Sequence, residues 1–373
     1  MVRSSDSARV VLLVGTRKGL FLARADARRR DWRLDGPHLA GYEVYHTLLD
    51  PRDGNTVYAA VRHAVWGVHI HRSADVGRTW ELLPEVPHHG STEPAQGLTS
   101  IWYLAPGHTG EADTLYAGGE PAGLFVSRDR GASWSAVGGL NDHPTRGTWQ
   151  AAKGGLALHS IYVDPRDARR IYAAVSAGGV YRSDDGGASW SPANRGVRAD
   201  YLPVTQPETG HCVHRIVLHP AQPDRLYRQC HTGTYRSDDR GAHWVEITDG
   251  LPSDFGYAIA TDPRDPDTVY VIPEESSHIR TTVGGALTVY RSRDAGTSWE
   301  PLTHGLPREN AYVTILREAM DTDGLDPCGV YFGTSSGHLF ASRDGGDSWE
   351  IIAGFLPRIL SVQAGILETA PGE

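Results

Sequence analysis

The sequence predicts an all-β fold, a seven-bladed β-propeller built from four-stranded antiparallel blades. The first observation behind this expectation is a repeated eight-residue pattern, Ser-x-Asp-x-Gly-x-x-Trp. Its six copies begin at Ser73, Ser127, Ser183, Ser237, Ser292 and Ser342. These serines lie 50 to 56 residues apart, and one signature per period of this length marks a repeat architecture. The second observation is that the repeats also carry the residues of four short strands.

One repeat, residues 159–192, shows the order of these strands. HSIYVDP contains strand-forming residues and leads into a turn, after which IYAAVSA, a Gly-Gly turn and VYRSDDGGASW follow. Val, Ile and Tyr favour strands, whereas Pro after Asp favours entry into a turn. The repeat is therefore interpreted as a four-stranded antiparallel sheet. Because one such sheet cannot bury both of its faces, we expect the sheets to pack face to face around an axis.

The repeated pattern is expected to be structural. Its Asp and Gly fall in the turn between the third and fourth strands, where a carboxylate can accept backbone N–H groups and Gly can adopt a positive φ. Its Trp opens the fourth strand and is expected to pack between neighbouring sheets. Asp344 and its equivalents should therefore stabilise turns and take no part in chemistry.

The two chain ends predict how the ring closes. Residues 10–32 read as a second, third and fourth strand that end at Trp32, without a first strand. Residues 358–367 read as a first strand with nothing after it. Together they complete a seventh blade, which would remove exposed sheet edges and make residues 1–373 a single domain.

Composition excludes several classes of protein. A formal net charge of −9 argues against a nucleic-acid partner. The apolar run 10–14 is too short to span a membrane and does not resemble a signal peptide, so we expect a cytoplasmic protein. Three cysteines make no disulfide framework. Cys212 and Cys230 could approach each other across a hairpin, but in a cytoplasm we expect them reduced.

The six boxes resemble the BNR or Asp-box repeats of sialidases, related glycoside hydrolases, sortilin-type receptors and a photosystem II assembly factor. The segment GTRKGLF near the N-terminus also resembles bacterial BNR-repeat proteins described as glycosyl hydrolase-like or sialidase-like. This resemblance implies a propeller and, by its enzyme members, a hydrolase. The Phe-Arg-Ile-Pro segment of sialidases is absent, and the boxes lie away from active sites in these families.

The strand order predicts which residues share the face opposite the boxes, called the upper face here. First strands begin there and second strands end there. The upper-face positions that the repeats predict include Arg17, His46, Arg62, His63, Glu120, His159, His214, His231, Tyr257 and Glu274. They are far apart in sequence, but a propeller would bring them around one channel.

Three of these residues are candidate metal ligands. His159, His214 and His231 come from adjacent blades, and three imidazoles with a carboxylate such as Glu274 would suit a divalent Zn, Mn or Fe ion. The alternative is that these histidines are hydrogen-bonded residues that fill a narrow channel.

Glu120 and Glu274 are candidate catalytic residues, because glycoside hydrolysis needs two carboxyl groups on either side of the bond. Tyr257, which is predicted on the same face, is a third candidate catalytic residue. The alternative is that the carboxylates line a solvated pore. Sialidases bind the substrate carboxylate through three arginines, and Arg17 is similar in position to the first of them.

The candidate substrate-binding residues are Arg17, His46, Arg62, His63, Trp66 and Trp149. Trp66 and Trp149 lie in long upper-face loops, where an exposed ring can stack on a sugar; a small loop core is the alternative. The sequence thus favours a hydrolase or lyase acting on a carbohydrate or small polar molecule. A propeller that binds a ligand or protein without turnover, as an assembly scaffold, is the other interpretation.

Overall fold

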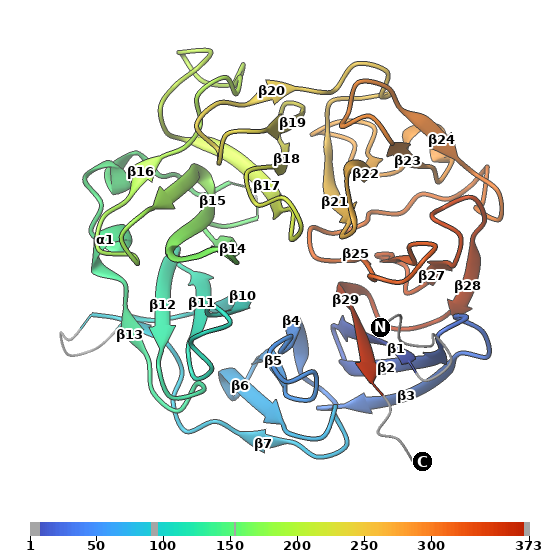
Figure 1. The fold of residues 1–373 in the computed structure, drawn as a ribbon, viewed down its shortest axis with the longest axis horizontal. Coiled ribbons are helices and arrows are strands. Elements are labelled where there is room, and N and C mark those ends of the chain that lie inside the picture. The colour runs from blue at the N-terminus through green and yellow to red at the C-terminus, as the bar shows by residue number, and fades with distance from the viewer. Residues whose placement is uncertain (1–7, 91–95, 153, 369–373) are drawn as a thin grey trace.

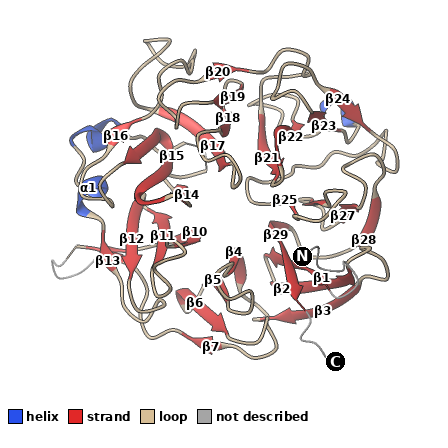
Figure 2. Ribbon diagram, viewed as in Figure 1, coloured by secondary structure: helices blue, strands red, loops and turns tan. Residues whose placement is uncertain are grey.

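The computed structural model describes residues 8–90, 96–152 and 154–368 and is almost entirely β-structure. Its sheets stand side by side around a common centre (Figure 1), and helical turns occur only towards the outside (Figure 2). The helical turns are α1 (Gly138–Asn141), η2 (Pro144–Thr148) and η3 (Val283–Gly285). None of the helices in the described part of the chain has the length and apolar character needed to cross a membrane.

Five sheets have four strands each, and all pairings within them are antiparallel. Each sheet is described from the centre of the ring outwards. The first contains β29 (Ile359–Glu368), β1 (Ala8–Thr16), β2 (Gly19–Asp26) and β3 (Arg33–His38). The second contains β4 (Glu43–Leu49), β5 (Val57–His63), β6 (Gly67–Ser73) and β7 (Glu81–Leu82). The third contains β10 (Ser100–Pro106), β11 (Leu115–Glu120), β12 (Gly123–Ser127) and β13 (Ser135–Ala136). The other two contain β21 (Gly256–Asp262), β22 (Asp265–Pro273), β23 (Val289–Ser292) and β24 (Glu300–Leu302); and β25 (Met320–Thr322), β26 (Val330–Gly333), β27 (Leu339–Ser342) and β28 (Glu350–Ala353).

A sixth sheet has seven strands, because β15 pairs with both β14 and β17. Its strands are β14 (Leu158–Asp164), β15 (Asp167–Ser183), β16 (Ser191–Pro192), β17 (His211–Leu218), β18 (Leu226–Cys230), β19 (Thr234–Ser237) and β20 (Val245–Glu246). The short β8 (His88–His89) and β9 (Gln96–Gly97) form a separate pair.

The distribution of apolar residues explains this arrangement. Every residue of the inner strands β17 and β21 is buried, whereas both residues of the outer strands β7, β13 and β20 are exposed. A strand that is covered on both faces reads as a nearly continuous apolar run, as β17 and β21 do. The buried residues form cores that join neighbouring sheets; one extends from Tyr116 of β11 to Tyr181 of β15. Packing between sheets is therefore what holds the ring together.

The two chain ends pair as the sequence predicted. β29 runs antiparallel to β1, with Val10 opposite Ile366 and Val14 opposite Val362. This places the last described strand on the inner side of the first sheet (Figure 1).

The six boxes have the structural role predicted for them. In the last one, Asp344 accepts hydrogen bonds from the Ser342 hydroxyl (2.7 Å), the Ser348 amide (2.9 Å) and the Ser348 hydroxyl (2.5 Å). The Ser342 hydroxyl also accepts the Gly346 amide at 2.8 Å, and Gly346 has a φ of +98°. The Trp244 indole donates to the Ala193 carbonyl of the preceding repeat at 2.9 Å, whereas the Trp80 and Trp190 indoles donate to Gly77 and Gly187 of their own boxes. The motif thus closes a turn, and through Trp244 it also contacts the preceding repeat.

A β-bulge recurs in the inner strands. In β4, Val44 and His46 pair with consecutive residues of β5, so Tyr45 has no partner in the ladder. The same irregularity leaves out Trp102 in β10, His159 in β14 and His214 in β17, and it spans Tyr257 in β21. Because a bulge changes the direction in which a side chain points, this repeated feature determines what lines the centre of the ring.

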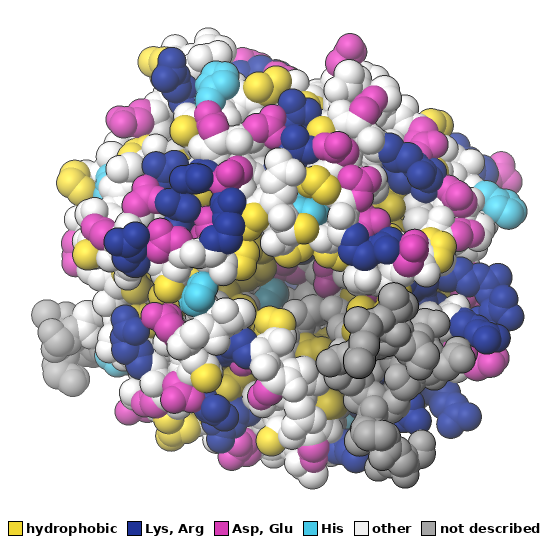
Figure 3. All heavy atoms as spheres, in the orientation of Figure 1, with side chains coloured by type: hydrophobic (Ala, Val, Ile, Leu, Met, Phe, Trp, Pro, Cys, Tyr) yellow, Lys and Arg dark blue, Asp and Glu magenta, His cyan; other side chains and the backbone are white. Residues whose placement is uncertain are grey.

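One face of the ring carries interspersed basic and acidic side chains around a central hollow (Figure 3). Between two blades, for example, Asp224 pairs with both Arg166 (2.5 Å) and Arg240 (2.7 Å). Exposed pairs of this kind contribute little to stability, so the apolar cores remain the main source of cohesion.

Removing β29 should destabilise the whole ring. A chain that ends at Arg358 loses every pairing with β1 and exposes the buried side chains of that strand, including Val11 and Leu13. We expect loss of cooperative thermal unfolding, measured by circular dichroism or calorimetry, whereas a chain that ends at Glu368 should unfold as the full chain does. A truncated chain with an unchanged transition would contradict this role of β29.

Replacing a box aspartate should change stability alone. Hydrogen bonds from the box serines outweigh the effect of burial and lower the pKa of Asp344, so its contribution is lost as the pH falls through that lowered value. We expect Asp344→Ala to lower the free energy of unfolding in urea by about 1–3 kcal/mol at neutral pH. The control is Asp249→Ala, at an exposed position. A fully stable Asp344→Ala protein that has lost ligand binding or activity would contradict the assignment.

Candidate functional site

A cavity of about 1010 Å³, called the upper cavity here, lies between the inner strands of the ring. Its lining residues come from all around the ring and include Tyr45, Trp102, His214, Tyr257, Arg317 and Glu318. Four of these six, Tyr45, Trp102, His214 and Tyr257, are the bulge residues of their strands. The bulges therefore supply the upper cavity with aromatic and imidazole rings.

Arginine is the commonest charged residue of the cavity wall. Arg17, Arg280, Arg317 and Arg358 all line it. The guanidinium carbon of Arg317 lies 5.4 Å from the Trp102 ring and 5.4 Å from the Tyr257 ring, so the cation is held between two aromatic side chains. Burial lowers the pKa of Arg317, although it remains far above neutrality for any arginine. The wall can thus stack on a flat ligand and donate several hydrogen bonds to it.

Glu318 is the one carboxylate among the described residues that line the upper cavity. Its side chain is buried, and Arg215 lies 3.6 Å away. Arg215 also donates to the carbonyls of Arg317 (2.7 Å) and Met320 (2.8 Å), so it fixes the backbone that carries both Arg317 and Glu318. Burial raises the pKa of Glu318, while Arg215 and Arg317 act to lower it. A carboxyl group with a raised pKa is suited to proton donation.

A second cavity of about 660 Å³ lies on the other side of this charged pair and is called the lower cavity. Arg215 and Glu318 line it together with His46, Tyr103 and Asp321. Glu318 is therefore shared by the two cavities, whereas Asp321 belongs to the lower one only.

Arg17 and Tyr257 lie where the sequence predicted them, on the upper cavity wall. Arg17 is exposed and pairs with Glu43 at 3.3 Å. Tyr257 is buried, which raises its pKa although Arg280 and Arg317 oppose the shift. Their roles in binding and catalysis stay predictions.

Glu120 and Glu274 lie behind the cavity wall. The Glu120 carboxylate accepts the Trp102 indole N–H at 2.9 Å and so supports a residue that lines the cavity. The Glu274 carboxyl is 1% exposed, and neither oxygen has a partner of normal hydrogen-bond geometry. Burial raises its pKa to about 8, although Thr314 and Arg280 lie near enough to oppose the shift. Glu274 is therefore predominantly protonated at neutral pH.

His159 does not join the other two predicted metal ligands. It is fully buried, and its ring nitrogens bond to the Val213 carbonyl (3.0 Å) and the Ser160 hydroxyl (3.2 Å). Burial holds its pKa well below the usual value. The alternative interpretation, a hydrogen-bonded residue that fills space, is correct for His159.

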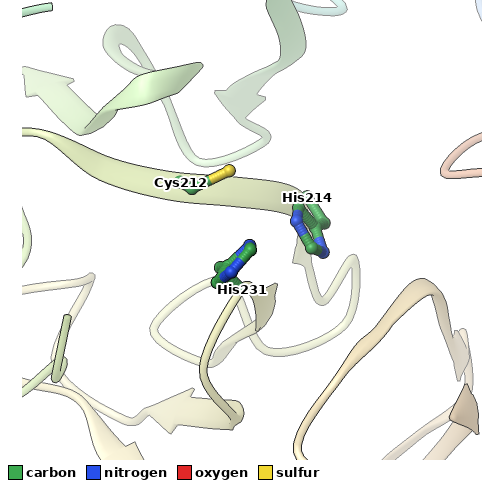
Figure 4. A group of neighbouring side chains, drawn as sticks. All are labelled: Cys212, His214 and His231. Atoms are coloured by element: carbon green, nitrogen blue, oxygen red, sulfur yellow. The ribbon is translucent and has the colours of Figure 1, made fainter. Parts of the chain in front are cut away.

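Cys212 takes the place that His159 was expected to occupy. Atoms of Cys212, His214 and His231 able to bind a metal all lie within 4.8 Å of one another (Figure 4). All three cysteines of the chain are free and buried, so Cys212 is not joined to Cys230.

His46 and Trp149 are also misplaced by the sequence prediction. The bulge leaves His46 facing the lower cavity, where it accepts the Leu104 amide at 3.2 Å and burial lowers its pKa to about 3. Trp149 is 6% exposed and packs in a core between blades, with its indole donating to the Tyr181 hydroxyl at 2.7 Å. Neither side chain can contact a ligand in the upper cavity.

Arg62, His63 and Trp66 lie at the turn between β5 and β6, outside the upper cavity wall. His63 accepts the amides of Val65 (3.1 Å) and Trp66 (3.3 Å) and so shapes the turn. Trp66 is 67% exposed. The prediction that these three residues line the same site as Tyr257 is wrong, because none of them lines the upper cavity.

The sequence prediction missed Glu318 and Cys212. Four repeats have a proline in the turn after their first strand. The residue six positions before that proline is Tyr45, His159, His214 or Tyr257. Six positions before Gly324 lies Glu318, but glycine replaces the proline in this repeat and hides the alignment. Cys212 could have been found from its position two residues before His214, which allows both side chains to lie on one side of a strand.

The family model for the BNR/Asp-box repeat matches residues 181–192. The chain carries BNR/Asp-box repeats. The matched residues are the third complete box, whose Asp185 bonds to Ser183 and Ser189 as Asp344 does in the last box.

The chain is similar to several xyloglucanases. It is 25% identical over 287 residues to the oligoxyloglucan-reducing end-specific xyloglucanase of Emericella nidulans, a match that covers 68% of this chain and 34% of that protein. It is 27% identical over 342 residues to a xyloglucanase of Hypocrea jecorina, covering 80% of this chain and 38% of that protein. The chain thus spans about a third of the length of these relatives.

Among solved structures, the GH74 xyloglucanase from Xanthomonas campestris superposes with a TM-score of 0.63 at 20% identity. The match covers 92% of this chain and 52% of that one. At this level of identity the similarity supports the all-β propeller fold and does not identify the activity.

The buried Glu274 should make stability depend on pH. Its pKa in the folded state, about 8, lies above its usual value of 4.5, so the stability linked to its neutral form is complete below pH 4.5 and is lost as the pH rises through 8. Glu274→Gln has no carboxyl group to ionise and so removes this loss. The unfolding free energy of the variant minus that of the unaltered protein should therefore increase between pH 5 and pH 9, by an amount of the order of 4 kcal/mol.

Urea denaturation at several pH values measures this difference. Glu275→Gln is the matched control, because Glu275 is the exposed neighbour. A difference between Glu274→Gln and the unaltered protein that stays constant with pH would contradict the assigned pKa.

Proposed function

We propose that the chain is a carbohydrate-acting hydrolase whose substrate binds in the upper cavity. The observation that carries this proposal is the combination of stacking rings and a buried carboxyl group in one cavity. Trp102 and Tyr257 flank Arg317, and Glu318 lies beside Arg317 in the sequence and on the same wall. Aromatic faces stack on sugar rings, and arginines donate to sugar oxygens. The similarity to xyloglucanases supports a polysaccharide or oligosaccharide as the substrate.

Glu318 is the proposed proton donor. In hydrolysis the carboxyl proton goes to the oxygen that leaves the sugar carbon, and water supplies the oxygen that replaces it. Burial raises the pKa of Glu318, against the opposing effect of Arg215 and Arg317, and a raised pKa suits a carboxyl group to proton donation. Glu120 supports the Trp102 ring from behind the cavity wall, while Tyr257 contributes to the binding wall.

A second candidate function is binding without turnover. It is favoured by one observation: Glu318 has no companion carboxylate among the described residues that line the upper cavity, whereas glycosidases use two. The same rings and arginines would then hold a sugar or another polar ligand.

We also infer that the sheets form one seven-bladed domain over residues 1–373. Five sheets have four strands each, and the seven-stranded sheet is equivalent to two blades because β15 supplies the second and third strands of one of them. The β29–β1 pairing supports closure of the ring.

Glu318→Gln tests the catalytic part of the proposal. We expect hydrolysis of xyloglucan oligosaccharides, measured as new reducing ends, to fall by about 100-fold or more, because the amide cannot donate the same proton. Binding of the oligosaccharide, measured by calorimetry, should change by less than about threefold, well under the 1.4 kcal/mol that a tenfold change represents. Asp321→Asn is the matched control, since Asp321 is a half-buried carboxylate that also interacts with Arg215 but lines only the lower cavity.

The outcomes of these assays distinguish a hydrolase from a protein that binds its ligand without turnover. Hydrolysis that survives in Glu318→Gln would overturn the assignment of the proton donor. Binding without hydrolysis by the unaltered protein would support the binding module, and neither activity with any oligosaccharide would overturn both.

A further inference from the structure

Three metal-binding side chains converge at one point of the upper cavity. Cys212 and His214 both belong to β17, and His231 directly follows β18, the neighbouring strand of the same sheet. Figure 4 shows the three side chains gathered between these two strands. Their ligand atoms lie within 4.8 Å of one another, and the backbone fixes their spacing because the His231 amide donates to the Cys212 carbonyl at 3.0 Å.

The orientation of His214 suits metal binding. Its Nδ1 lies 2.5 Å from the Gly256 carbonyl oxygen. A carbonyl only accepts hydrogen bonds, so Nδ1 carries the proton and Nε2 keeps a lone pair. A histidine that ligates a metal usually donates its other ring nitrogen to a carbonyl or carboxylate, which fixes the tautomer and the ring orientation. The tilted stacking of Tyr257 on the His214 ring, with centroids 4.6 Å apart, restrains the ring further.

The surroundings of the cluster leave one side open. Tyr201, which also lines the upper cavity, covers part of the cluster: its hydroxyl accepts the Cys212 amide at 2.6 Å and its ring centroid lies 4.9 Å from that of His231. All three candidate ligands nevertheless line the upper cavity. Three protein ligands with a fourth position open to a cavity are the arrangement of catalytic zinc sites, whereas structural sites use four protein ligands.

We propose that Cys212, His214 and His231 bind a thiophilic divalent transition metal, zinc in the first place, with the fourth coordination position facing the upper cavity. A thiolate with two imidazoles suits Zn²⁺ or copper and does not suit Mg²⁺ or Ca²⁺, which prefer oxygen ligands. Ligand atoms of a tetrahedral zinc ion lie roughly 3.3–3.8 Å apart, given Zn–N and Zn–S bonds of about 2.0–2.3 Å. Since the present separations are at most 4.8 Å, the side chains have to close in by no more than about 1.5 Å.

The charges around the cluster indicate what the fourth position would hold. Arg317 and Arg280 line the same cavity, so a bound divalent ion adds to an already positive wall. Such a field favours an anionic ligand, such as hydroxide or the carboxylate of a sugar acid, over a neutral one. The metal site does not depend on the proposed hydrolase activity, because a metal can bind without any substrate.

Cobalt binding to the chelator-treated protein tests the site. Co²⁺ replaces Zn²⁺ in tetrahedral sites, and a cysteine ligand produces a sulfur-to-cobalt charge-transfer absorption in the near ultraviolet. We expect one Co²⁺ per chain with this absorption, and its displacement by Zn²⁺. Cys212→Ser should abolish the absorption, and Cys212→Ser and His231→Gln should each weaken Zn²⁺ binding, measured by calorimetry, by about 10-fold or more.

The matched controls are Cys230→Ser, a buried cysteine on the adjacent strand, and His159→Gln, the buried histidine that lies outside the cluster. Both should keep the absorption and the affinity. Zn²⁺ should also raise the Tm of the unaltered protein and of both controls but not that of folded Cys212→Ser. If Cys212→Ser does not fold, His231→Gln carries the same test.

The proposal is overturned if Co²⁺ binds without the sulfur-to-cobalt absorption, if binding is not stoichiometric, or if Cys212→Ser retains both the absorption and the affinity. Because no sugar is present in these experiments, their outcome is independent of the result of the hydrolysis assay.

Discussion

The recurring β-bulge of the inner strands is the feature on which the upper cavity depends. In a regular strand, alternate side chains would point into the two neighbouring blade cores. The bulge interrupts this alternation at Tyr45, Trp102, His214 and Tyr257 and turns these side chains towards the centre of the ring. The residue after the bulge then faces another way, as His46 does on the lower cavity wall. The repeat therefore supplies the scaffold, and substitutions at one repeat position vary the side chains that line the cavity.

Buried charged groups at the centre of the ring reduce the stability of the fold, so packing alone does not explain their presence. Removing a guanidinium or carboxylate from water is unfavourable unless hydrogen bonds or an opposite charge compensate. Arg215 is compensated by Glu318 and by two carbonyls, and Arg317 by two aromatic faces. Glu274 has no such partner and is kept neutral by its raised pKa. This concentration of buried polar groups beside a cavity is typical of a functional site.

The sequence predicted the fold better than the site, and the reason lies in the repeat. Turn residues such as Asp344 and Gly346 have the same surroundings in every blade, so six copies support one interpretation. The direction of a side chain near the axis depends on the β-bulge, and no residue type in the sequence predicts where a bulge occurs. Assigning all strand starts to one face therefore placed His46 with Tyr257. His159 has the same bulge position as His214, but it is buried and bonds to the Val213 carbonyl of the next inner strand. Trp66 and Trp149 lie in loops that look similar in the sequence. Only the structure shows that Trp66 is exposed and that Trp149 is buried in a core.

We propose that the chain holds its ligand in the upper cavity, and a crystal structure of the protein with a xyloglucan oligosaccharide tests this proposal. We expect a sugar ring stacked on Trp102 or Tyr257, with hydrogen bonds to Arg317 and Glu318. A sugar bound elsewhere, such as on the exposed Trp66, with the upper cavity holding none, would contradict it.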